Sequence, residues 1–173
     1  FNFNGEPIVP KLEFLKALAI ARVYGFKEYE KALTFIKLNY STTIEGKEAE
    51  LILDEVLPEV QNDNFKSNKM SDNYKIIYQF TMESHDEISS QINDLKQYID
   101  NVDYLDLRVS KDFYNNIITF VVVHGLKSYD GSLGLAERLE KTIDIQADSF
   151  FVLSSDNYKT IQIHKNLEKF ENK

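Results

Sequence analysis

Residues 73–124 constrain the fold more than any other part of the chain, because their hydrophobic period changes from that of a strand to that of a helix and back. In the first segment, large apolar residues alternate with Lys75, Ile77, Gln79 and Thr81, as they do in a strand with one buried face. The inward positions are Tyr74, Ile76, Tyr78, Phe80 and Met82. We therefore expect a sheet with a helix packed on it.

The helix that follows this strand begins at a capping box. Ser84 and Glu87 have the S-x-x-E spacing, in which the two side chains provide partners for free amides of the first helical turn. Apolar residues then recur every three or four positions, at Ile88, Ile92, Leu95 and Ile99. This single stripe indicates an amphipathic helix.

Two further strands are predicted after the helix. The first has alternating apolar positions at Leu105, Leu107 and Val109. The second covers residues 117–123 and is apolar on both faces. The turn between them is expected at residues 111–116, where Asn115 and Asn116 tolerate a positive φ.

The rest of the chain adds one more helix and one more strand, over residues 130–142 and 149–153. Gly131 and Gly134 lie near the start of this helix, where they are interpreted as positions that allow the helix to approach the sheet closely. The element order is strand, helix, strand, strand, helix, strand. This βαββαβ order is that of the ferredoxin-like fold, with two helices on one face of a four-stranded antiparallel sheet. The predicted class of the chain is α+β.

The first part of the chain contains helical patterns only. A helix is predicted over residues 11–24, and Gly25 ends it because glycine accepts the left-handed conformation. Its apolar residues on one side are Leu12, Leu15, Leu18 and Ala19. A second helix, over residues 27–39, has an apolar stripe at Tyr29, Ala32, Leu33 and Ile36.

A third helix is predicted to open at a second capping box, formed by Thr42 and Glu45, and to close at Pro58. Its inward residues are Ala49, Ile52, Leu53, Val56 and Leu57. Helices joined by such short turns are typical of helical-repeat proteins.

The predicted division has a helical segment at residues 1–58, a linker at 59–72 and the ferredoxin-like domain at 73–173. The linker is polar and has no hydrophobic period. In the C-terminal tail, Ile161 and Ile163 alternate as in a strand, whereas the start at Ser155 suits a capped helix. We predict a short helix there, followed by a second one from Asn166.

Composition and charge limit the classes of partner. The formal net charge is −8 and the sequence pI about 4.9. Acidic residues outnumber basic ones in residues 1–60 (10 against 7) and in 61–173 (18 against 13). Phosphate groups are bound by clustered Lys and Arg, so neither nucleic acid nor an anionic lipid surface is an expected partner. The sequence contains no cysteine, which excludes disulfides and thiolate metal sites.

The beginning of the sequence lacks the basic and apolar regions of a signal peptide. It also lacks an initiating methionine, so the chain is interpreted as a fragment of a longer protein.

No group of residues forms a recognisable reaction centre. The three histidines, His85, His124 and His164, have no HxH or HExxH spacing. Gly125, Gly131 and Gly134 do not form a phosphate-binding loop, and Ser132 has no nucleophile-elbow context. The sequence therefore predicts a protein that is not an enzyme and has no metal or cofactor.

The third predicted strand suggests an exposed apolar patch. It is central in a ferredoxin-like sheet, and Val121 and Val123 are expected on the open face beside Ile77. Either the helical half or a loop covers this face, or it is a protein-binding surface.

The chain resembles a family of large cell-envelope lipoproteins of Bacteroidota, the SprE/PorW-type proteins of the type IX secretion and gliding motility system. Residues 11–53 resemble their last tetratricopeptide-like units, although Ser41 stands where proline is usual. Residues 120–128 and 151–167 resemble segments of the family's C-terminal domain, and these segments are the most specific part of the likeness.

The resemblance implies a protein at the periplasmic face of the outer membrane, attached by a lipid anchor upstream of this chain. It would act as a non-enzymatic assembly factor that binds other envelope and secretion-system proteins. Tyr158 and His164 lie in the family-like tail and are candidate partner contacts, although Tyr158 equally suits packing against the sheet. The alternative is a small-ligand sensor of the ferredoxin-like type, which would require a pocket with convergent polar groups.

Overall fold

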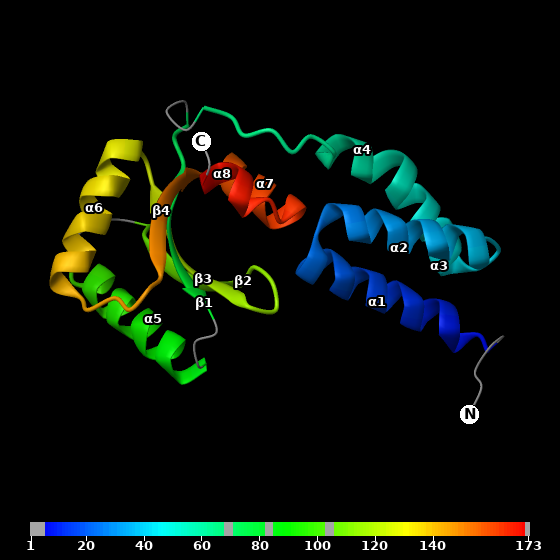
Figure 1. Cartoon of the computed structure of the whole chain (residues 1–173), viewed down its shortest axis with the longest axis horizontal. Helices are drawn as coiled ribbons and strands as arrows, with labels where there is room; N and C mark the ends of the chain where they lie inside the picture. Colours follow the sequence, from blue (N-terminus) through cyan, green and yellow to red (C-terminus); the bar gives the residue numbers. More distant parts are fainter. Residues whose placement is uncertain (1–5, 68–70, 82–84, 103–105, 172–173) are drawn as a thin grey trace. The chain divides into compact units, whose positions relative to one another are not determined.

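The computed structural model describes residues 6–67, 71–81, 85–102 and 106–171, and shows helices followed by a four-stranded antiparallel sheet with further helices (Figure 1). The α+β class is therefore confirmed. The chain forms two compact units. One contains residues 1–64 and 160–173 and is called the helical unit; the other contains residues 65–159 and is called the sheet unit.

The N-terminal part of the helical unit, described from residue 6 to residue 64, is built from three helical stretches joined by short turns. Its elements are α1 (Ile8–Tyr24), α2 (Phe26–Asn39), α3 (Ile44–Leu51), the π-helical turn η1 (Ile52–Val56) and α4 (Leu57–Val60). Gly25 separates α1 from α2 with a φ of 80°, as the sequence predicts. A Cβ at this position would lie 2.7 Å from the carbonyl oxygen of Ile163, so glycine is required for two reasons.

The start and the end of the third helical stretch differ from the prediction. Thr43, rather than Thr42, is the N-cap, and its hydroxyl accepts a hydrogen bond from the Gly46 amide at 3.1 Å. Pro58 does not close the stretch, because α4 continues to Val60. Since α4 begins after a π-helical turn, Pro58 lies in a first turn, where a missing amide hydrogen costs little.

The predicted apolar side of α1 is exposed. Leu12, Leu15 and Leu18 are 54%, 61% and 45% exposed, whereas Ala17 is buried. The small Ala17 side chain lets α2 and α3 approach α1 closely, so the helix buries its alanine side rather than its leucine side. The core of the unit contains Ala17, Phe26, Leu33, Ile36, Ala49 and Leu57. Val56, predicted to point inward, is exposed.

The sheet unit places two helices on one face of its sheet (Figure 1). The strands are β1 (Tyr74–Thr81), β2 (Arg108–Phe113), β3 (Ile118–Leu126) and β4 (Ser149–Ser154), and the helices are α5 (His85–Asp100) and α6 (Tyr129–Thr142). The strand order is β2-β3-β1-β4, and every neighbouring pair is antiparallel.

The prediction that Val121 and Val123 lie on the open face beside Ile77 is wrong. The register pairs Val121 with Tyr78 and Val123 with Ile76, and these residues form a core with α5 and α6. Ile77 pairs with Val122 and therefore faces the other side of the sheet. All three predicted patch residues are fully buried, because β1 and β3 are the central strands and are covered on both faces.

The second strand lies later in the sequence than predicted. β2 starts at Arg108 and continues to Phe113, which pairs with Thr119, so residues 111–113 belong to the strand and not to the turn. Asn115 and Asn116 do not have a positive φ. Instead, the Asn115 side chain accepts hydrogen bonds from the amides of residues 117 and 118, which closes the turn.

Some predictions fall outside the described residues. These are the strand position of Met82, the capping role of Ser84 and the strand position of Leu105.

Gly131 and Gly134 do not mediate close packing between α6 and the sheet. Both are exposed, and a Cβ at Gly134 would meet nothing within 4 Å. The buried side of α6 instead carries Ser132, Leu135, Ala136 and Leu139. This side of α6 faces the sheet because Leu135, Ala136 and Leu139 bury apolar surface there.

The C-terminal tail is helical, as predicted, and forms α7 (Ser155–His164) and α8 (Leu167–Glu171). The division of the chain differs from the predicted one, since residues 160–173 group with the helical unit. Within that unit, Lys169 forms an ion pair with Asp63, and the Asn166 side chain donates to the Asp63 carbonyl at 3.3 Å.

Candidate functional site

The structure buries four of the five predicted contact residues and leaves His164 partly exposed. Ile77, Val121 and Val123 are core residues of the sheet unit. Tyr158 is also buried, with its ring 6.3 Å from that of Phe120. It therefore packs against the sheet, which is the structural alternative considered above.

His164 has internal partners in the helical unit. Its Nε2 lies 2.9 Å from the carbonyl oxygen of Val60, and its ring packs against that of Phe26 in a tilted arrangement with the centroids 5.2 Å apart. Since a carbonyl oxygen only accepts hydrogen bonds, Nε2 carries the hydrogen and donates it. These contacts give His164 a structural role, because they join the end of α7 to the end of α4 and the start of α2.

A polar cluster lies on the face of the sheet opposite α5 and α6. Among the described residues, it is the arrangement that most resembles an active site. His124 Nδ1 is 3.0 Å from Lys75 Nζ, and His124 Nε2 is 2.7 Å from Ser110 Oγ. Ser110 donates to one oxygen of Asp112 at 2.8 Å, and the Tyr158 hydroxyl donates to the other oxygen at 2.5 Å. Ser, His and Asp side chains are also hydrogen-bonded to one another in catalytic triads. The directions of the hydrogen bonds therefore decide whether Ser110 could act as a nucleophile.

The hydrogen-bond directions in this cluster do not support a nucleophilic serine. A lysine ammonium group only donates, so His124 Nδ1 accepts from Lys75 and Nε2 carries the ring hydrogen. Nε2 then donates to Ser110, whose own hydrogen is directed to Asp112. Because His124 presents no lone pair to the serine hydroxyl, it cannot remove its proton. The cluster instead links β1, β2, β3 and α7 by hydrogen bonds.

The electrostatics of the cluster agree with a neutral imidazole. Burial, followed by the nearby Lys75 charge, lowers the pKa of His124 from 6.5 to about 4. Burial and the Arg108 charge also lower the pKa of Lys75.

A titration of His124 tests these directions. Because its folded pKa lies below its unfolded value, the stability that the neutral ring contributes is present above pH 6.5 and is lost as the pH falls through 4. We expect the NMR signal of the His124 ring to titrate near pH 4 and the melting temperature to fall between pH 6.5 and 4. The variant His124→Gln should show a weaker fall in that range. A ring midpoint at or above 6.5, or the same fall in the variant, would contradict the assignment.

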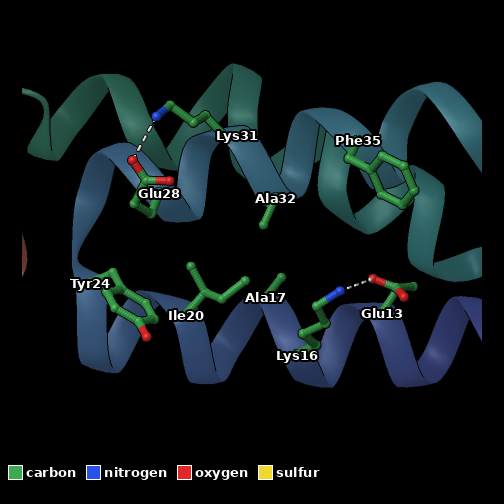
Figure 2. A pocket seen from close by; sticks show the side chains of 9 residues that line it. All are labelled: Glu13, Lys16, Ala17, Ile20, Tyr24, Glu28, Lys31, Ala32 and Phe35. Atoms are coloured by element: carbon green, nitrogen blue, oxygen red, sulfur yellow. Dashed lines mark hydrogen bonds and ion pairs between the residues drawn. The ribbon is translucent and has the colours of Figure 1, made fainter. Parts of the chain in front are cut away.

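An exposed groove lies between α1 and α2 (Figure 2). It has a volume of about 510 Å³. Small and apolar side chains, Ala17, Ile20 and Ala32, form its centre, and Tyr24 and Phe35 lie at opposite ends. Both aromatic rings are accessible, since Tyr24 is 59% and Phe35 48% exposed.

Two ion pairs border this groove, one on each helix (Figure 2). Lys16 pairs with Glu13 on α1 at 3.3 Å, and Lys31 pairs with Glu28 on α2 at 2.6 Å. Each pair spans one helical turn and is exposed, so it adds little to stability. The rim therefore carries charges of both signs around an apolar floor, which is the composition of a protein-docking surface.

Sequence reasoning missed the groove because it treated each helix separately. The missed signal is a repeated pattern, in which Glu, Lys, Ala and a large apolar residue follow at fixed spacing. It occurs at residues 13–20 and again at residues 28–35. When two neighbouring helices both carry this pattern, a groove between them is predicted to have similar side chains on its two walls.

A second cavity, of about 310 Å³, lies beside the start of α6. Lys127 and Arg138 contribute to its lining, together with several glycines and serines. Its buried hydroxyl, that of Ser132, already donates to the Ser128 carbonyl at 2.7 Å, and the Ser128 hydroxyl accepts from the Gly131 amide. The serine hydroxyls are thus used in capping α6 and do not converge on the cavity.

Within the part of the chain that the structure describes, no group of three His, Asp or Glu side chains is placed to hold a metal ion. None of its helices is both long enough and apolar enough to cross a membrane. No family model, curated protein or solved structure matches this chain.

Proposed function

We propose that this protein is a non-enzymatic protein-interaction module and that the groove between α1 and α2 is its docking surface. The observation that carries this proposal is the pair of exposed aromatic rings, Tyr24 and Phe35, at the two ends of an apolar floor. Aromatic side chains beside a preformed groove are the usual anchors of protein interfaces. Helices that dock apolar side chains into such grooves form one of the recurring modes of recognition.

We also propose a finer description of the two units. The strand order β2-β3-β1-β4, with antiparallel neighbours and with α5 and α6 on one face, supports a ferredoxin-like topology for the sheet unit. The antiparallel pair α1 and α2, with α3 packed against both, supports a tetratricopeptide-like arrangement in the helical unit.

We also propose a cellular context for this module, based on its resemblance to SprE/PorW-type proteins. On that basis, the chain is part of a lipid-anchored protein at the periplasmic face of the outer membrane. Its groove would dock other components of the type IX secretion and gliding machinery during assembly. The support for this context is the sequence likeness of residues 120–128 and 151–167.

A small-ligand sensor is the alternative function. It requires a cavity into which polar groups converge. The capping hydroxyls beside the second cavity are used within α6, and the larger groove has an apolar floor, so both features favour the docking module.

The docking module is tested by capture from envelope extract. The chain is compared with the double variant Tyr24→Glu, Phe35→Glu, which places charges at both anchors. We expect the variant to lose capture of secretion components by about tenfold or more, since an aromatic anchor contributes about 1.4 kcal/mol or more to binding.

The matched control is Leu15→Glu, Leu38→Glu, which adds the same charges to the same two helices outside the groove. Leu15 and Leu38 are 61% and 75% exposed, so this variant keeps the fold and should retain capture. Circular dichroism verifies that both variants are folded. Equal capture by both variants would refute the groove as the docking surface.

A further inference from the structure

We draw no further inference here: the strongest candidate, the cavity beside the start of α6 with the exposed Lys127 and Arg138 in its lining, is formed around a helix N-terminus whose buried Ser132 hydroxyl already donates to the Ser128 carbonyl, so nothing among the described residues shows which ligand it would hold.

Discussion

Replacement of Gly46 by alanine is expected to lower the free energy of unfolding of the helical unit by about 3 kcal/mol. Gly46 is buried in the first turns of α3. A Cβ there would lie 2.5 Å from the carbonyl carbon of Tyr40 and would overlap with the carbonyl oxygen of the same residue. That oxygen accepts hydrogen bonds from the amide and the hydroxyl of Thr43 at 2.9 and 2.8 Å, so it cannot move away without breaking the turn before α3.

The matched control is Gly134→Ala in α6, where a Cβ would meet nothing within 4 Å. Alanine is a better helix former than glycine, so this variant should gain about 0.5–1 kcal/mol. Urea unfolding followed by circular dichroism gives both values, and amide NMR signals assign them to the two units. If Gly46→Ala proves as stable as the unmodified chain, the close approach of Tyr40 to α3 is not present in solution.

The substitution Val121→Glu is expected to unfold the sheet unit rather than to change a binding surface. Val121 is fully buried between Tyr78 on β1 and Lys111 on β2, on the face that packs against α5 and α6. A carboxylate at this point has no partner, and an unpaired buried charge costs about 3–5 kcal/mol. This cost approaches the whole stability of a small domain, which is about 5–15 kcal/mol.

Ile117→Glu is the control for this substitution. Ile117 lies just before β3 and is 50% exposed, so its replacement should change the free energy of unfolding by no more than about 0.5 kcal/mol. Far-ultraviolet circular dichroism and amide NMR dispersion report the loss of the sheet. A folded Val121→Glu chain with an unchanged melting temperature would contradict the assignment of Val121 to the core.

Local sequence patterns were sufficient to predict most helices and strands. The glycine at position 25 ended α1 as expected, because its positive φ is a local property of the backbone. The stripe of α2 also followed from local periodicity, and the helical tail followed from the helix start at Ser155. Turn details were predicted less well: Asn115 acts through side-chain hydrogen bonds, which its residue type alone does not distinguish from a positive φ.

Long-range contacts decided which face of each element is buried and which side chains meet in the polar cluster. Residues 118–123 are apolar on both sides, and only the pairing of β3 with β1 decides that Val121 and Val123 face the helices while Val122 faces away. For the same reason, the polar cluster around His124 joins residues from three strands and one helix, which have no common spacing in the sequence.

The sequence alone predicted the kind and order of most elements, because helix and strand periods are read over a few neighbouring residues. Only the tertiary structure decided which side of α1 is buried, because Ala17 packs closely where the larger leucines cannot. The same packing aligned the two Glu–Lys–Ala patterns across α1 and α2 and so created the groove. A docking surface is shared between elements, and its existence depends on how closely their backbones approach.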